Sequence, residues 1–252
     1  MPDGLKQRML AGDTLVGTFV KTPAIEMVEV LGRSTLDFLC LDAEHAAFDR
    51  GRMDACLAVA RAMGVPTLVR VPAGTPDRIL VTLDAGATGI VVPHVDSVEK
   101  ARAVAKAARF GHGGRGFAGS TRWAGFATRG MGEILQQSRD ETVVIAQIEE
   151  PEGVEAADAI AAVEGIDGLF VGPADLAVSQ GLSGANDPQV MEQMAVVGRA
   201  AEGAGKAFMT WTAGPSNADA LRAAGVTMFF VASEHAFMLQ GANAAADGFR
   251  GG

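Results

Sequence analysis

Hydrophobic positions along the chain follow two alternating patterns. Short apolar runs rich in Val, Ile, Leu and Phe are separated by longer stretches in which Ala, Leu and Val recur at helical spacing. Runs such as Val143–Ala146 are apolar at every position, as in parallel strands that are covered on both faces. The short runs predict strands at Leu15–Val20, Phe38–Leu41, Thr67–Val71, Gly89–Val92, Val143–Ile148, Gly168–Val171, Ala207–Trp211 and Met228–Ala232.

Helix boundary signals lie between these runs. Asp96-Ser-Val-Glu99 has the spacing of a capping box that opens a helix over Val98–Arg109. Thr75-Pro76 places a cap residue before a proline in the first helical turn. Glycines stand where helices are expected to stop before the next strand, at Gly64, Gly86, Gly165 and Gly225.

The alternation predicts an α/β fold. About eight β–α units fill the chain, and that number closes a (β/α)8 barrel of the TIM type. An open, doubly wound sheet is the competing fold, but no Gly-x-Gly-x-x-Gly follows the first predicted strand. No Pro- or Ser-rich linker divides the sequence, so residues 1–252 are expected to form one domain.

Composition narrows the range of partners and locations. Against 21 Lys and Arg stand 30 Asp and Glu, a formal net charge of −9 that disfavours nucleic acid and anionic lipid surfaces. Residues 1–12 lack the apolar core and cleavage site of a signal peptide, and the apolar runs are far shorter than the roughly 20 residues that span a bilayer. Cys40 and Cys56 have no metal-type spacing. We therefore expect a soluble, cytoplasmic protein.

One segment interrupts the rhythm of strands and helices. Phe110–Gly132 is rich in glycine, contains Trp123 and is long for a connection between the fourth and fifth strands. Long ordered loops often serve as lids or substrate walls. A flexible excursion without a function is the alternative.

Polar residues gather where the predicted strands end, which in a barrel is the face that carries the active site. Glu149 and Asp175 on neighbouring strands can hold a hard divalent cation, and the absence of nearby Cys or paired His argues against structural zinc. Arg70 suits an oxygen-rich anionic substrate. His45 can carry a proton, and Asp42, three residues earlier, can orient it.

Each of these residues also has an ordinary structural role open to it. A strand-end carboxylate is commonly a loop cap or a member of an ion pair, Arg70 alone can pair with Glu149 or Asp42, and many histidines close a helix end. Four suitable residue types on one rim are harder to explain in this way. The residues by themselves indicate a metal-assisted site for an anionic substrate.

Lysine placement bears on Schiff-base catalysis, the alternative to a metal-assisted site. A Schiff-base enzyme needs a desolvated lysine in its pocket. Lys21, just after the first strand, is a candidate, whereas Lys206 precedes the seventh strand and falls on the opposite face. No lysine stands at the end of strands five to seven, which disfavours the Schiff-base route.

Several motifs together resemble the HpcH/HpaI aldolases, which are class II pyruvate aldolases related to 4-hydroxy-2-oxoheptanedioate aldolase. The resemblance runs from about Leu15 to Ala232, with the motifs in order. They are Leu41-Asp-Ala-Glu-His45, Leu68-Val-Arg-Val71, Ala146-Gln-Ile-Glu149, Phe170-Val-Gly-Pro-Ala-Asp-Leu176, Gly114-Arg-Gly116 and Thr121-Arg-Trp123.

The resemblance implies reversible cleavage of a 4-hydroxy-2-oxo acid to pyruvate and a small aldehyde through a metal-bound pyruvate enolate. It implies that Glu149 and Asp175 bind Mg²⁺, Mn²⁺ or Co²⁺, and that Arg70 contacts the ketone oxygen. His45, paired with Asp42, would be the acid/base group. Pyruvate would also meet the turn that follows the sixth strand. The substrate-binding residues implied are Arg70, Gly172, Pro173, Ala174 and Gln147, with Phe117, Ala118, Trp211 and Thr212 shaping the aldehyde pocket.

The family further implies a homo-oligomer, commonly a hexamer, in which the last helix is swapped between neighbours. The Ala/Met/Phe-rich tail from His235 is equally compatible with a buried helix in a monomer. Ala43 replaces the usual glycine of the family's Asp-Gly-Glu-His motif, and the match is weak around Phe208–Ser216. The rival activities are an acyl-CoA lyase of the malyl- or citryl-CoA type, for which no clustered basic patch is visible, and a metabolite-binding barrel without catalysis.

Overall fold

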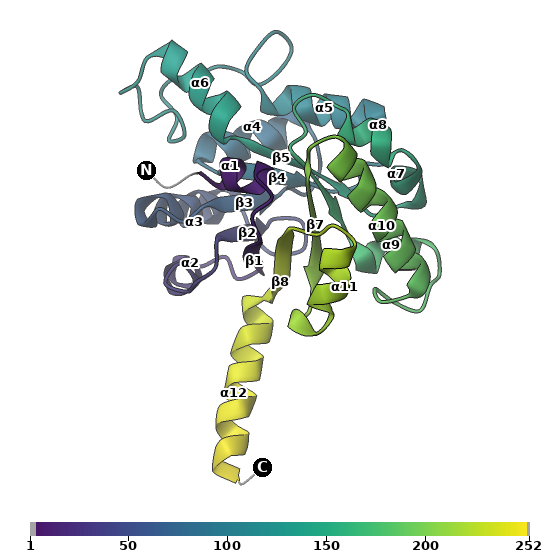
Figure 1. Cartoon of the computed structure of the whole chain (residues 1–252). Coiled ribbons are helices and arrows are strands. Elements are labelled where there is room, and N and C mark those ends of the chain that lie inside the picture. Colours follow the sequence, from purple (N-terminus) through teal and green to yellow (C-terminus); the bar gives the residue numbers. More distant parts are fainter. Residues whose placement is uncertain (1–3, 251–252) are drawn as a thin grey trace.

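The computed structural model describes residues 4–250 as alternating strands and helices (Figure 1). The strands are β1 (Leu15–Val20), β2 (Phe38–Asp42), β3 (Thr67–Arg70), β4 (Gly89–Val92), β5 (Val143–Ile148), β6 (Gly168–Val171), β7 (Ala207–Thr212) and β8 (Met228–Ser233). The helices are α1 (Leu5–Leu10), α2 (Ile25–Leu31), α3 (Arg50–Met63), α4 (Pro76–Ala85), α5 (Val98–Ala108), α6 (Met131–Glu141), α7 (Pro151–Glu155), α8 (Ala157–Ala161), α9 (Pro173–Ser179), α10 (Pro188–Gly203), α11 (Ala218–Ala223) and α12 (Glu234–Arg250). A short 3-10 turn, η1 (Pro215–Asn217), precedes α11.

The strands close into a parallel barrel in sequence order, β1 to β8, with β8 pairing back to β1. The predicted (β/α)8 fold is therefore confirmed. Because all strands are parallel, their carboxyl ends meet on one rim of the barrel. Register brings side chains of that rim together directly: Asp42 on β2 is the partner of Arg70 on β3.

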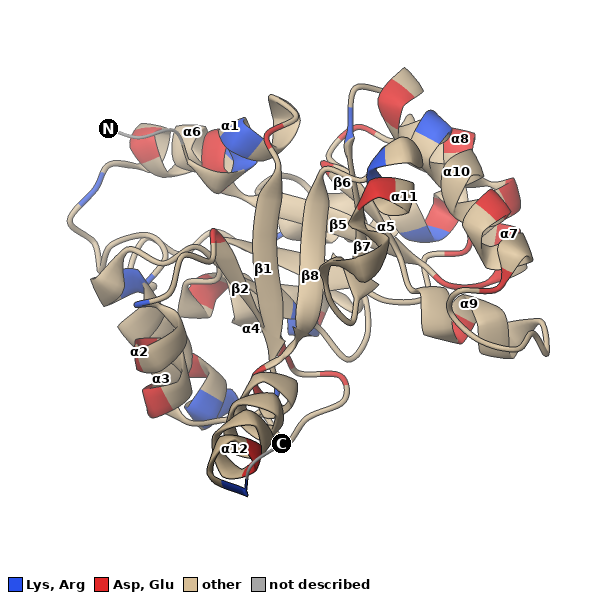
Figure 2. Cartoon of the chain, turned by 60° about the horizontal axis from the view of Figure 1, so that its bottom comes forward, with Lys and Arg blue, Asp and Glu red and all other residues tan. Residues whose placement is uncertain are grey.

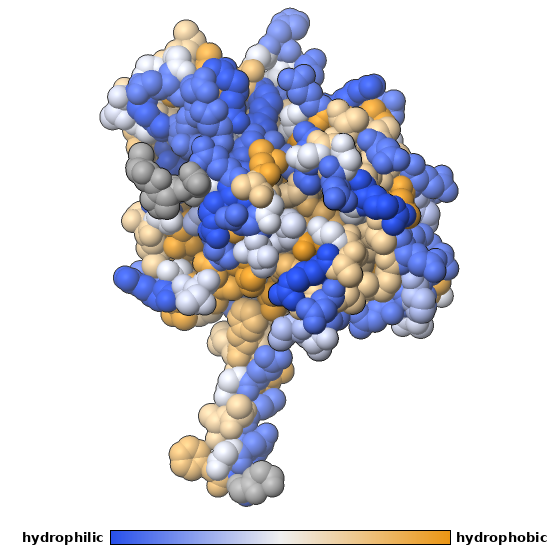
Figure 3. Space-filling view, in the orientation of Figure 1, coloured by the Kyte–Doolittle hydropathy of each residue, from blue (hydrophilic) through white to orange (hydrophobic). Residues whose placement is uncertain are grey.

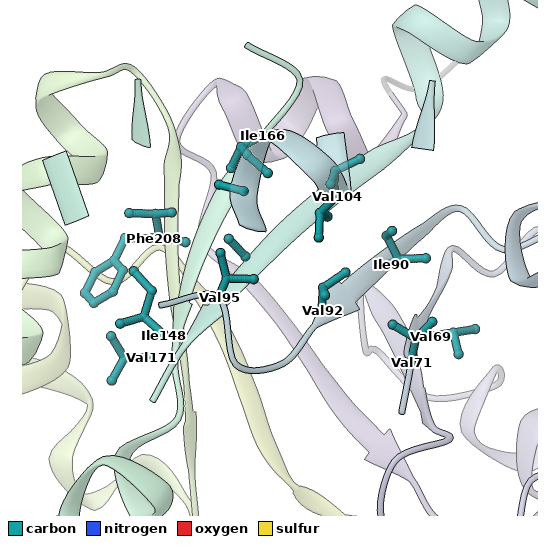
Figure 4. Close-up of a cluster of buried hydrophobic side chains, with 14 of the residues drawn as sticks. Val69, Val71, Ile90, Val92, Val95, Val104, Ile148, Ile166, Val171 and Phe208 are labelled. Atoms are coloured by element: carbon teal, nitrogen blue, oxygen red, sulfur yellow. The ribbon is translucent and has the colours of Figure 1, made fainter. Parts of the chain in front are cut away.

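Apolar side chains fill two layers on either side of the strands. One cluster lies inside the barrel, where the Phe230 ring packs within 4.9 Å of the Phe38 and Phe170 ring centroids. Leu5 and Met9 of α1 belong to this inner cluster, so the N-terminal helix covers one end of the barrel. The second cluster lies between the strands and the helices; Figure 4 shows part of it, including Val69, Ile90 and Ile148. Alternate residues of each strand thus face opposite layers.

Most charged residues lie outside the barrel strands. Figure 2 shows Lys, Arg, Asp and Glu on the surrounding helices and loops, while the ribbons of β1 and β8 carry none. Within residues 4–250 no helix combines the length and apolar character needed to cross a membrane.

The helix signals give mixed outcomes. α4 begins at Pro76 with Thr75 as its N-cap, and Gly64 and Gly86 end α3 and α4 in the left-handed conformation, as predicted. The capping box at Asp96 is wrong: Ser97 is the N-cap of α5 and accepts from the Lys100 amide. The Asp96 carboxylate instead forms an ion pair with the Lys100 ammonium.

The glycine-rich segment is packed rather than loose. The buried Arg115 guanidinium lies 4.5 Å from the Phe110 ring centroid and 4.9 Å from that of Trp123, and it pairs with Asp84 at the end of α4. The segment follows α5 and precedes α6, which leads into the start of β5. It therefore lies toward the amino-terminal ends of the strands, opposite the rim that their carboxyl ends form in the same chain.

The last helix departs from the rest of the fold. α12 projects away from the barrel (Figure 1), and one side of it is hydrophobic in the space-filling view (Figure 3). Met238 and Leu239 are 59% and 63% exposed, and Phe249 is 98% exposed. A monomer with this surface would leave a sizeable apolar face in water.

Candidate active site at the carboxyl rim

A cavity of about 360 Å³ opens at the carboxyl ends of the strands. It brings together most of the residues that the sequence assigns to the site: His45, Arg70, Gln147, Gly172, Pro173, Ala174, Asp175 and Trp211. Larger hollows on the surface, such as one lined by Lys6 and Arg109, lie near the amino-terminal ends of strands and contain none of these residues. The rim cavity is therefore the candidate active site.

Arg70 is fixed in this cavity by a buried ion pair. Its Nε donates to Asp42 Oδ1 at 3.0 Å and its Nη2 donates to Oδ2 at 2.8 Å. The guanidinium carbon also lies 4.5 Å from the centroid of the Phe19 ring. Burial alone would raise the pKa of Asp42, but the bonds from Arg70 and Lys21 outweigh it and lower that pKa. The result is a rigid, charged fork at the cavity wall.

Glu149 lies just beyond the end of β5 and is 2% exposed. Burial raises the pKa of its carboxyl, opposed by bonds from Gln147 and the His94 amide, while the nearby charge of Asp175 raises it further. The Gln147 side-chain amide donates to Oε2, and the His94 N–H donates to Oε1 at 2.9 Å. A buried carboxylate with a second acid group close by favours a cation between them.

Gly172 makes room for this carboxylate. A Cβ at residue 172 would stand 2.8 Å from Glu149 Oε2, closer than side chains tolerate. The residue directly follows β6 and is the N-cap of α9, whose first turn carries the exposed Asp175. The two acids thus come from neighbouring strand ends, as the sequence predicts.

His45 lies at the cavity wall with 54% of its side chain exposed. The predicted pairing with Asp42 differs in the structure: Asp42 Oδ1 accepts from the His45 backbone N–H at 3.2 Å, and no bond between the carboxylate and the ring occurs. The acidic group within ion-pair distance of the ring is Glu44, whose Oε2 lies 3.6 Å from His45 Nε2 and 3.2 Å from Arg70 Nε. Burial raises the pKa of Glu44, although the Arg70 charge opposes this.

His94 and Glu150 form a cluster with Glu149 that the sequence analysis missed. His94 Nδ1 lies 2.5 Å from Glu150 Oε1 and 3.1 Å from Glu149 Oε1. One potential ligand atom from each of the three residues falls within 4.8 Å of the others. The His94 backbone is left-handed, with φ of 57°, and this conformation aims both its N–H and its ring at Glu149. His94 lies two residues after the end of β4, and this position at a strand end is the sequence signal that could have identified it.

Three predicted pocket residues lie elsewhere in the chain. Thr212 does not line the rim cavity. Its hydroxyl lies 2.9 Å from the Gly214 carbonyl oxygen and also bonds the Asn217 side chain. Phe117 and Ala118 belong to the segment near the amino-terminal end of the barrel and do not line the rim cavity of their own chain. The other residues that line the cavity are Phe19, Lys21, Phe170, Ala213, Ala232, Ser233, Ala236 and Gln240.

The arrangement defines a class of protein: a (β/α)8 barrel with acidic, cationic and imidazole side chains around one cavity at its carboxyl rim. The sequence model described as HpcH/HpaI aldolase/citrate lyase matches residues 15–241. The chain belongs to this family.

Individual relatives agree with that assignment. A hydroxypyruvate/pyruvate aldolase of Roseovarius nubinhibens is 34% identical over 71% of this chain and 70% of its own length. A 5-keto-4-deoxy-D-glucarate aldolase of Enterobacter sp. is 33% identical over 99% and 97%. The crystal structure of an HpcH/HpaI aldolase/citrate lyase family protein from Burkholderia cenocepacia superposes with a TM-score of 0.91 at 33% identity, covering 98% of both chains.

Proposed function

We propose that this protein is a class II aldolase that cleaves a 4-hydroxy-2-oxo acid reversibly to pyruvate and a small aldehyde. The observation that carries the proposal is a fixed guanidinium and an exposed carboxylate at the wall of one rim cavity of about 360 Å³, with the buried Glu149 carboxylate directly behind Gln147 and Gly172 of that wall. Membership of a family that contains pyruvate-forming aldolases supports it.

Glu149 and Asp175 would hold Mg²⁺, Mn²⁺ or Co²⁺, since such ions accept carboxylate oxygens as ligands. The surroundings fit a cation. Glu150 Oε2 is buried without a hydrogen-bond partner in the described part of the chain. Burial also raises the pKa of the Glu149 carboxyl, so a nearby positive charge would stabilise its ionised form. His94 and Glu150 lie close enough to join the ligand set. When bound, the ion supplies Lewis-acid polarisation of the substrate ketone.

Arg70 would bind the ketone oxygen of the pyruvyl group. Its fork is held by Asp42 before substrate arrives, so stabilising negative charge on this oxygen requires no rearrangement of the side chain. The backbone amides of the turn Gly172–Asp175 would meet the pyruvyl carboxylate, as amides of tight turns commonly hold anions.

His45 would exchange the substrate proton. In the cleavage direction its ring takes the proton from the 4-hydroxyl, the C3–C4 bond breaks to form the aldehyde carbonyl, and the bonding electrons pass to the oxygen on C2. A proton delivered to C3 then releases pyruvate. Asp42 contributes by holding the His45 backbone, and Glu44 stands beside the ring as its nearest carboxylate.

Metal removal tests the class II assignment. Treatment with EDTA followed by desalting is expected to abolish release of pyruvate from a 4-hydroxy-2-oxo acid, and Mg²⁺ or Mn²⁺ should restore it. Full activity in protein shown to be metal-free by elemental analysis would contradict the proposal. Malyl-CoA and citryl-CoA are assayed beside the oxo acid, and preferential cleavage of either ester would favour an acyl-CoA lyase.

We also propose a homo-oligomer, a hexamer by family resemblance, in which α12 packs on a neighbouring copy. The exposed Met238, Leu239 and Phe249 support this because they lie on the projecting helix and lack cover from their own barrel. The glycine-rich segment of a neighbouring copy, with Phe117 and Ala118, would then reach the rim cavity of this chain, although it does not line the rim cavity of its own chain.

A further inference from the structure

Lys21 stands on the side of the rim cavity away from the acid pair. It directly follows β1, whereas Glu149 and Asp175 follow β5 and β6. In the closed order β1 to β8, β1 and β5 are four strands apart, which is across the barrel. If the proposed function holds, the pyruvyl end of the substrate lies near β3, β5 and β6, and the aldehyde end extends toward β7, β8 and β1.

The backbone around Lys21 is held firmly. Glu234, the first residue of α12, is 2% exposed, and its carboxylate accepts from the Lys21 N–H at 2.9 and 3.0 Å and from the Thr22 N–H at 2.5 Å. The same helix sends Ala236 and Gln240 to the cavity wall. Lys21 is therefore a fixed part of the wall and not a mobile surface lysine.

The Lys21 ammonium has donors to spare. Its Nζ lies 3.0 Å from Asp42 Oδ2, yet both oxygens of that carboxylate already accept bonds from Arg70. Arg70 has Glu44 as a second acidic neighbour, at 3.2 Å, while Asp42 is the acidic partner of Lys21 in residues 4–250. An ammonium carries three donors. With 32% of its side chain exposed, Lys21 can turn a donor toward the cavity.

We propose that Lys21 is a specificity-determining residue that binds an anionic group on the aldehyde half of the substrate. Among the described residues that line the cavity, Lys21 and Arg70 supply all the Lys and Arg. The part of the wall that β7, β8 and α12 provide is apolar or neutral, formed by Trp211, Ala213, Ala232, Ser233, Ala236 and Gln240. A volume of about 360 Å³ is at the small end for ligand sites. The substrate class is thus short aldehydes ending in a carboxylate or a similar anion.

A matched pair of aldehydes tests this role. The variants Lys21→Gln and Lys21→Arg are compared with the wild type in aldol addition of pyruvate to succinic semialdehyde and to butanal, which have the same chain length. In Lys21→Gln the ratio of kcat/KM for the acidic over the neutral aldehyde is expected to fall roughly 10- to 100-fold, the range for loss of a charged hydrogen bond. Lys21→Arg should retain part of the preference. Lys106→Gln, an exposed lysine in the last turn of α5, should change neither rate.

Other outcomes overturn the inference. Equal losses for both aldehydes in Lys21→Gln would mean that Lys21 acts only by supporting Asp42. A wild-type enzyme that adds pyruvate to butanal as well as to succinic semialdehyde would remove the anion-binding role. Loss of deuterium exchange into pyruvate in Lys21→Gln would place Lys21 on the pyruvyl half. Absence of that exchange in the wild type would instead reject the proposed function itself.

Discussion

The site depends, at the residue scale, on one carboxylate. Asp42 is fully buried, and it accepts from Arg70, the Lys21 ammonium and the His45 backbone. A buried acid left without its partners costs several kcal/mol, so removing either member of the Asp42–Arg70 pair would disturb folding as well as chemistry. The pair therefore fixes both the position and the charge of the cationic wall.

Substitution of Arg70 separates substrate activation from metal binding. Arg70→Lys keeps a charge for Asp42 but loses the fork, and we expect turnover to fall by ~10²–10³, as when a fixed donor to a developing oxyanion is removed. Affinity for Mn²⁺, measured by titration calorimetry, should stay near the wild-type value because Glu149 and Asp175 remain. Near-normal turnover in Arg70→Lys and in Arg70→Ala would remove Arg70 from the mechanism.

Strand-end reasoning locates residues well but not their contacts. It places Arg70 and Asp175 on the rim because strand ends can be read from apolar runs. It misses His94 and Glu150, since their approach to Glu149 depends on a left-handed backbone that no sequence pattern announces. The link from Asp42 to the His45 backbone, in place of the ring, is likewise set by the local turn.

At the element scale, the strands follow directly from the sequence. All eight predicted runs are strands, with boundaries within one residue of those observed, because buried parallel strands leave a continuous apolar record. The position of Phe110–Gly132 could not be predicted from the sequence. Its length shows that the segment is unusual, but only its place between α5 and α6 puts it toward the amino-terminal end of the barrel. Thr212 was also misplaced. Side chains alternate along a strand, so Thr212, one residue after Trp211, faces away from the rim cavity that Trp211 lines.

Helix α12 provides a test of assembly. Leu239→Asp puts a charge on its exposed apolar side, and we expect the oligomer to dissociate to smaller species because burying that charge is unfavourable. Analytical ultracentrifugation measures the distribution. Ala244→Asp adds the same charge to the opposite side of the helix and serves as the control. A wild-type monomer, or an oligomer indifferent to Leu239→Asp, would contradict packing through this face.

Across the whole molecule, the closed barrel separates stability from chemistry. The inner and outer apolar clusters hold the strands, while the charged groups around the rim cavity come from residues at or just after strand ends. Arg70, Glu149 and Asp175 are distant in sequence and come together because the strands are parallel. The central claim is that this rim turns pyruvate into its enolate with the help of a divalent cation.

Deuterium exchange into the methyl group of pyruvate tests that claim without knowledge of the aldehyde. In D₂O with Mg²⁺ or Mn²⁺, NMR should show the methyl signal disappearing at a rate proportional to enzyme concentration, and EDTA should stop the exchange. Exchange that continues unchanged in EDTA would contradict the role of the cation. A methyl signal that persists with every cation tried would contradict the assignment of this rim to pyruvate.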